Sequence, residues 1–224
     1  MLDVSRIRGI CFDIDGTLSD TDNEFVRRLN NWLLTVKLLF PTWDSLSFSR
    51  RVVMASETPA TFLHILPDRF GIDGKIAVIG DYLHSRGIGR PARPLSLIPG
   101  VIEMLEELSI HYSLSIVSSR GRMRVQYFLT QFNIREYFMS VVTAQTCERV
   151  KPHPGPVLWA AKQMNFLPQQ CLMVGDTTVD IIAGRQAGAQ TVGVLCGFGE
   201  EKELLESGAD LILETTPDLV RYIL

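Results

Sequence analysis

Asp13 and Asp15 are two carboxylates, two positions apart, in the run CFDIDGTL at 11–18. They follow an apolar segment, residues 7–12, that is typical of a buried strand. A carboxylate at a strand end can act as a nucleophile or hold a cation, and its neighbour can transfer protons. Gly16 lets the chain turn sharply there, because it has no Cβ atom. The pair alone also fits a turn or a helix cap, so the rest of the chain must decide.

Three further polar segments follow along the chain, and two of them end an apolar run. They are Ser118-Ser119 after residues 112–117, Lys151 at the start of a helix-like stretch, and Asp176 with Asp180 after residues 171–174. In α/β proteins, ligand sites lie at the carboxyl ends of parallel strands. A carboxylate, a hydroxyl, an ammonium and a second acidic cluster are suited to holding a phosphoryl group beside a divalent cation.

Strand-like runs alternate with helical patterns through most of the chain, which predicts an α/β protein with a parallel sheet covered on both faces. The expected strands are residues 7–13, 112–118, 138–143, 170–175, 190–195 and 210–213. The expected helices between them include Val101–Leu108, Arg122–Phe132, Pro156–Met164 and Val179–Ala187.

Residues 19–97 lack this alternation and predict an inserted helical unit. A helix start is expected at 20–22, further helices near 59–66 and 75–85, and a return linker at 86–94, which is rich in glycine and proline. We therefore expect a core domain formed by residues 1–18 and 98–224, with a small helical cap domain at 19–97.

The polar segments resemble the four motifs of the haloacid dehalogenase superfamily, and the chain is similar to its phosphoglycolate phosphatase-like subgroup. The matching residues are Asp13-x-Asp15-Gly16-Thr17, Ser118, Lys151-Pro152 and Gly175-Asp176-x-x-x-Asp180. The resemblance covers residues 1–18 and 98–224 and is weak between them. It implies a Rossmann-like parallel sheet, with the first strand between the second strand and the strand that precedes Asp176. It also implies that the insertion is the family's helical cap, which closes over the site and excludes water.

The resemblance implies a catalytic role for three residues. Asp13 would attack phosphorus to form an aspartyl-phosphate, and Asp15 would protonate the leaving alcohol and then activate water. Lys151 would neutralise charge on the transferred group. Asp15 also favours phosphate chemistry, because the family's true dehalogenases lack an acid at this position.

The same resemblance implies how the phosphoryl group and the metal would be bound. Ser118, Ser119 and Gly16 would hold the phosphoryl oxygens. The Mg²⁺ ligands would come from Asp13, the backbone carbonyl of Asp15, and Asp176, with Asp180 supporting the metal or Lys151. The run Ser118-Ser119-Arg120 departs from the Thr-Asn-Lys of many phosphoglycolate-type relatives, which leaves the substrate open.

The expected function is a Mg²⁺-dependent phosphatase acting on a small, phosphoglycolate-like phosphomonoester. Three alternatives remain open: a phosphomutase of the β-phosphoglucomutase type, an inorganic pyrophosphatase, and a non-catalytic protein that binds a phosphorylated ligand. A sugar-phosphate isomer formed without phosphate release would identify the mutase. An inactive protein that still binds phosphorylated metabolites would favour the binding role.

Composition sets the remaining expectations. Residues 19–97 are mildly basic and the rest of the chain is acidic, which suits an anionic substrate above a cation site but not nucleic acid. No apolar run approaches a membrane span, and the first residues lack a signal-peptide pattern, so we expect a cytoplasmic protein without a membrane partner. Cys11 and Cys171 lie in apolar runs and are expected to be buried free thiols. A small phosphorylated metabolite is the expected partner of a monomer or homodimer.

Overall fold

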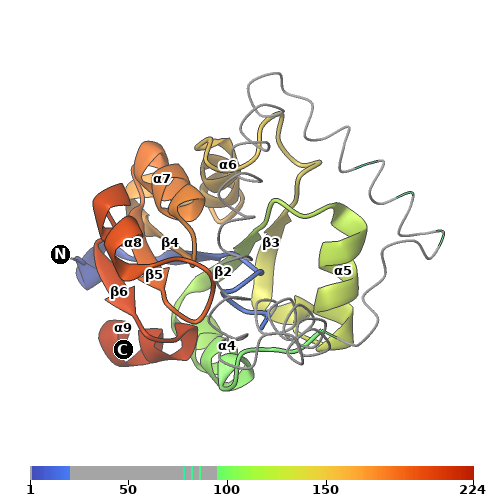
Figure 1. The fold of residues 1–224 in the computed structure, drawn as a ribbon, viewed down its shortest axis with the longest axis horizontal. Coiled ribbons are helices and arrows are strands. Elements are labelled where there is room, and N and C mark those ends of the chain that lie inside the picture. Colours follow the sequence, from blue (N-terminus) through green and yellow to red (C-terminus); the bar gives the residue numbers. More distant parts are fainter. Residues whose placement is uncertain (1, 21–77, 79–81, 83–85, 87–94) are drawn as a thin grey trace, which may run out of the picture.

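The computed structural model describes residues 2–20, 78, 82, 86 and 95–224 (Figure 1). Within these residues the chain forms a six-stranded parallel sheet of order β3-β2-β1-β4-β5-β6. The strands are β1 Gly9–Phe12, β2 Ser113–Val117, β3 Phe138–Val142, β4 Cys171–Gly175, β5 Gln190–Val194 and β6 Leu211–Leu213. Each lies inside a segment that the sequence predicts as a strand. The order confirms that β1 lies between β2 and β4, as the resemblance implies.

The four helices that the sequence predicts all form, with ends that shift by up to three residues, and the described residues add one α-helix after β5 and one after β6. The α-helices are α4 Val101–His111, α5 Arg122–Gln131, α6 Gly155–Gln163, α7 Thr178–Ala187, α8 Glu201–Ser207 and α9 Val220–Ile223. Short 3₁₀ helices are η1 Val4–Arg6, η3 Arg135–Tyr137, η4 Pro168–Gln170 and η5 Thr216–Leu219. In the described residues, no helix is long and apolar enough to cross a bilayer.

Successive side chains of each strand point to opposite faces of the sheet, and both faces are buried because helices pack against them. Ile10 and Phe12 of β1 join a cluster with the apolar residues of α4, α5 and α9. Cys11 points the other way and packs with Cys171 and the small residues of α6 and α7. Figure 1 shows α6 and α7 on one side of the sheet and α4 and α9 on the other. Cys11 and Cys171 are buried free thiols, as predicted.

The chain leaves and re-enters the core at one place. Ser19 pairs with Leu97 in an antiparallel bridge, and the backbone N–H of Asp20 donates to the carbonyl of Ser96 at 2.9 Å. The backbone N–H of Ile98 donates to the carbonyl of Leu18 at 3.0 Å. The helices expected from residue 20 onward, at 59–66 and at 75–85, and the linker at 86–94, lie outside the described residues apart from isolated positions.

The buried face of α4 offers a test of the packing. Leu105→Ala is expected to lower the free energy of unfolding by about 2–5 kcal/mol, because Leu105 is fully buried and the substitution leaves a cavity. Leu205→Ala on α8 is the matched control, since Leu205 is 51% exposed and its loss is expected to cost less than about 0.5 kcal/mol. Urea unfolding of both variants measures the difference. Equal losses would contradict this assignment of the core.

Candidate active site

The polar segments meet at the centre of the sheet, where the strand order reverses direction on either side of β1. Asp13 follows β1, Ser118 follows β2 and Asp176 follows β4, so three neighbouring strand ends each present a polar side chain. The backbone N–H of Asp13 donates to the carbonyl of Val174 at 3.0 Å, which extends the β1–β4 pairing to the site. Ligand sites of open α/β sheets lie in such crevices.

A buried lysine connects two of the carboxylates. The Lys151 Nζ lies 2.7 Å from Asp13 Oδ1 and 2.6 Å from Asp180 Oδ1. Burial alone would lower the pKa of Lys151, but the two carboxylates outweigh it and raise that pKa above its usual value. Lys151 is therefore a fixed positive charge directly beside Asp13.

Asp180 is held from both sides. Its Oδ1 accepts a hydrogen bond from Lys151, and its Oδ2 accepts from the backbone N–H of Thr177 at 3.1 Å and the Thr177 hydroxyl at 2.7 Å. Thr177 precedes α7, so these bonds cap the helix as well as placing the carboxylate. Because Asp180 is completely buried and its oxygens are already engaged, it is placed to orient Lys151.

Asp176 is fixed by two other segments. Its Oδ1 accepts from the Thr17 hydroxyl at 3.2 Å, and its Oδ2 accepts from the backbone N–H of Phe198 at 3.0 Å. Gly16 has φ of 65°, and a Cβ atom at Gly16 or Gly197 would collide with the Asp176 carboxylate. Glycine is thus required at both positions by close approach to this acid.

The loop that carries Asp13 is also tied to the end of the chain. The Thr216 hydroxyl, from η5, donates to the carbonyl of Thr17 at 2.5 Å. The Cys196 thiol lies 3.4 Å from the carbonyl of Gly16. The turn of the first motif is therefore supported by residues that follow β5 and β6.

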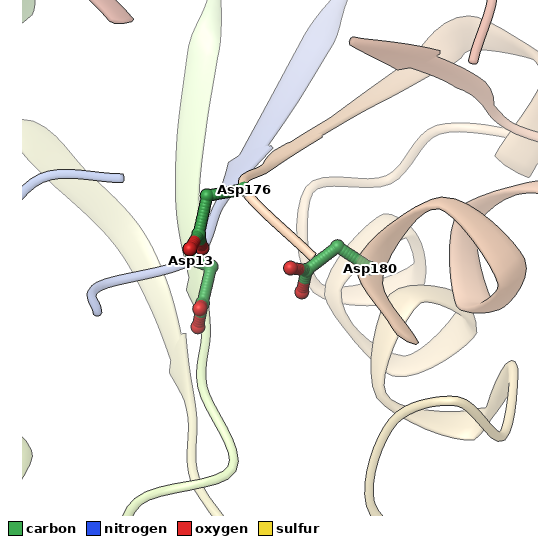
Figure 2. Close-up of side chains that lie close together, drawn as sticks. All are labelled: Asp13, Asp176 and Asp180. Atoms are coloured by element: carbon green, nitrogen blue, oxygen red, sulfur yellow. The ribbon is translucent and has the colours of Figure 1, made fainter. Parts of the chain in front are cut away.

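Three of the carboxylates could hold a metal ion together. Each of Asp13, Asp176 and Asp180 offers an oxygen, and these oxygens lie within 4.8 Å of one another. Figure 2 shows Asp13 and Asp176 at the ends of neighbouring strands, with the Asp180 carboxylate pointing toward them from α7. All three acids are buried, and oxygen ligands of this kind suit a hard cation such as Mg²⁺.

Asp15 lies apart from this cluster and pairs with a different cation. The Arg120 guanidinium forms an ion pair with Asp15 Oδ1, and both side chains are partly exposed. The backbone N–H of Arg120 also donates to the Ser118 hydroxyl oxygen at 3.2 Å. The two acids of the first motif thus have separate partners, Lys151 for Asp13 and Arg120 for Asp15.

The remaining predicted phosphate ligands differ in exposure. Ser118 and Gly16 are buried beside the site, whereas Ser119 is exposed. The structure also brings in residues to which the sequence analysis gave no role: Arg120, Thr17, Thr216 and the backbone of Phe198. For Arg120 and Thr17 the signal was available, since each lies within or beside a quoted motif. For Phe198 the signal is the pair of flanking glycines at 197 and 199, and nothing in the sequence singles out Thr216.

Burial raises the pKa of Asp13 to about 7, because its loss of hydration outweighs the attraction of Lys151. The negative charges of Asp180 and Asp15 act in the same direction. A cation placed between Asp13 and Asp176 would oppose both effects and favour the ionised carboxylate.

This shift predicts how Asp13→Asn changes stability with pH. An acid whose pKa is raised by folding keeps its proton where the unfolded chain has lost it, so its contribution to folding falls as pH rises. For Asp13 the fall extends from about pH 4 to about pH 7, between its unfolded and folded pKa values of 3.8 and about 7. Asparagine has no proton to lose, so the variant is expected to gain stability relative to wild type across this window and to level off above it.

Urea unfolding of both proteins in EDTA, at several pH values across this range, measures the difference. A stability difference that stays constant or shrinks as pH rises would contradict the raised pKa.

The sequence is similar to those of known hydrolases and phosphatases. The family model described as haloacid dehalogenase-like hydrolase matches residues 10–194. Pyrophosphatase PpaX of Oceanobacillus iheyensis is 29% identical over 218 residues, which cover 97% of each chain. A phosphoglycolate phosphatase of Salmonella choleraesuis is 27% identical, over 97% of this chain and 92% of that protein.

A solved structure agrees as well. A haloacid dehalogenase-like hydrolase from Streptococcus pneumoniae superimposes with a TM-score of 0.67 at 25% identity, over 98% of this chain and 100% of that one. The family match spans most of the chain, including every strand from β2 to β5 and the four polar segments that meet at the sheet. This chain belongs to the haloacid dehalogenase-like hydrolase family, and it is an enzyme of the phosphatase type within that family.

Proposed function

We propose that this protein is a Mg²⁺-dependent phosphatase that hydrolyses a small phosphomonoester through an aspartyl-phosphate intermediate. The observation that carries the proposal is the position of Asp13, which lies 2.7 Å from the Lys151 ammonium and in one carboxylate cluster with Asp176. A carboxylate nucleophile is repelled by a phosphate dianion, so positive charge nearby must offset the repulsion. Lys151 supplies one positive charge beside Asp13, and a cation bound by the carboxylate cluster would supply more.

In the first step, an oxygen of Asp13 forms a bond to phosphorus and the bond from phosphorus to the leaving oxygen breaks. Asp15 donates a proton to that oxygen, so the product leaves as an alcohol. In the second step, water attacks the same phosphorus, Asp15 accepts the proton, and the bond to Asp13 breaks to release inorganic phosphate. A bound Mg²⁺ would neutralise negative charge on the phosphoryl oxygens during both steps.

The other site residues support this chemistry from fixed positions. Lys151 neutralises charge on the transferred group, and Asp180 keeps the ammonium in place through its 2.6 Å contact. The metal would be held by Asp13, Asp176 and the backbone carbonyl of Asp15, and Asp180, the third acid of the cluster, would support the metal or Lys151. The Ser118 hydroxyl, the Ser119 backbone N–H and the turn at Gly16 would bind phosphoryl oxygens.

We also propose that residues 19–97 form a cap domain over the core of residues 1–18 and 98–224. The pairing of Ser19 with Leu97 supports these boundaries, since the inserted chain leaves and returns through one point beside the first motif. Such a cap would exclude water and contact the organic part of the substrate.

Pyrophosphate is a second candidate substrate. One of the relatives is named a pyrophosphatase, and hydrolysis of an anhydride needs only a different leaving group at the same site. Phosphoglycolate is the first choice of ester, in view of the relative from Salmonella choleraesuis.

The proposal is tested by measuring phosphate release from phosphoglycolate, pyrophosphate and a hexose phosphate, with Mg²⁺ and with EDTA. We expect metal-dependent release from at least one compound, and a loss of at least about 10³-fold in Asp13→Asn, because the nucleophile is removed. Release that persists in EDTA would refute the metal requirement. A hexose phosphate that isomerises without phosphate release would identify a mutase instead.

The role of Asp180 can be separated from its role as a helix cap. Asp218 accepts the same two hydrogen bonds, from the Thr215 backbone N–H at 3.1 Å and the Thr215 hydroxyl at 2.8 Å, but the cation beside it is the exposed Arg221 at 3.6 Å. Asp180→Asn is expected to lower kcat by about 10- to 100-fold, because Lys151 loses one of its two anchors.

Asp218→Asn is the matched control and is expected to keep wild-type kcat. Thermal unfolding of both variants measures the capping contribution separately. Equal activity of the two variants would contradict a function for Asp180 beyond capping α7.

A further inference from the structure

Arg120 is a cation of the site that the proposed mechanism does not use. It lies in the turn after β2, where its backbone N–H donates to Ser118 Oγ at 3.2 Å and its carbonyl accepts from the N–H of Ala144 at 2.9 Å. These two bonds fix the backbone of Arg120, and its guanidinium extends to the Asp15 carboxylate. The Arg120 side chain is 18% exposed and that of Asp15 is 33% exposed, so neither is fully enclosed by the protein.

Lys151 and Arg120, the two site cations discussed above, differ in their ability to bind an additional anion. The Lys151 side chain is only 2% exposed and contacts two carboxylates, so it is not placed to bind a second anion from solution. Arg120 has a partly exposed side chain, and a guanidinium carries five N–H donors, which suits two-point binding of a carboxylate or a phosphate. Arg120 is thus the described site cation that can receive an additional anion from solution.

The position of Arg120 relative to the reaction follows from the role of Asp15. To protonate the leaving oxygen, the Asp15 carboxylate must lie about 3 Å from that oxygen. Arg120 touches this same carboxylate, so its guanidinium lies within about 6 Å of the leaving oxygen, on the side of the leaving group. A negative group carried one or two atoms beyond the leaving oxygen falls within this distance.

We propose that Arg120 is a specificity-determining residue that binds a second anionic group on the leaving group of the substrate. When this group binds, the guanidinium transfers from Asp15 to it, and Asp15 is left to face the leaving oxygen. The favoured substrates are small phosphate esters or anhydrides with a carboxylate or phosphate within two atoms of the bridging oxygen. This inference rests on the proposed function, since it places the leaving group beside Asp15.

The test compares two esters that differ only in that anion. Phosphoglycolate carries a carboxylate, and 2-hydroxyethyl phosphate carries a neutral hydroxymethyl group in its place. For each protein the measured quantity is the ratio of kcat/KM for the first ester to kcat/KM for the second. Loss of folded protein lowers both values equally and leaves the ratio unchanged.

Wild type is expected to favour phosphoglycolate, and Arg120→Gln is expected to reduce the ratio by about 10- to 100-fold, which is the contribution of a charge-assisted hydrogen bond. Arg120→Lys is expected to restore part of the ratio, because it keeps the charge but not the two-point geometry. Arg122→Gln is the matched control, since Arg122 is exposed two positions later, and it is expected to keep the wild-type ratio. If Arg120→Gln lowers kcat/KM for both esters by the same factor, Arg120 does not bind the second anion.

A binding measurement separates this inference from the proposed function. The Asp13→Asn protein is titrated with each ester by calorimetry in the presence of Mg²⁺. We expect tighter binding of phosphoglycolate, and loss of that difference in the double variant Asp13→Asn, Arg120→Gln. Equal binding of both esters by Asp13→Asn would overturn the role of Arg120. Absence of phosphate release by wild type, together with selective binding, would refute the phosphatase proposal and leave the role of Arg120 standing.

Discussion

The contact of Lys151 with Asp13 and Asp180 is the interaction on which the site depends. Removing an ammonium from water costs several kcal/mol, by order of magnitude, so it is stable only where carboxylates surround it. The sequence places those carboxylates on two separate segments, one after β1 and one in the first turn of α7. Both segments must therefore reach their final positions before the charge of Lys151 is balanced.

The two parts of the site differ in burial. The part where the phosphoryl group would react is buried and held by many contacts, and the part where the leaving group would lie is more exposed. Asp13, Asp176 and Asp180 are each buried and held by hydrogen bonds or ion pairs from neighbouring loops. Asp15 and Arg120 are partly exposed and contact each other. Fixed side chains are suited to positioning the reacting phosphoryl group, and partly exposed side chains such as Arg120 are suited to selecting the substrate.

Much of the core could be predicted from the sequence, because parallel strands buried on both faces are read as continuous apolar runs. All six strands are predicted in this way, and helical spacing predicts α4, α5, α6 and α7 but not α8 or α9. The ion pair between Arg120 and Asp15 could not be predicted, because it joins residues from two strand ends whose side chains meet only in three dimensions. The hydrogen bond from Phe198 to Asp176 is made by a backbone N–H, which leaves no trace in the residue type.

The hydrogen bond from Thr216 to the carbonyl of Thr17 joins two segments that lie 199 residues apart in the sequence. Thr216 lies beyond the segment that matches the family model, in a part of the chain without any catalytic motif. On a ribosome the first motif emerges about two hundred residues before the threonine that supports it. A nascent chain could already have formed β1 and its neighbours while the turn behind Asp13 still lacked this contact. Residues synthesised much later than the first motif thus complete the turn behind its nucleophile.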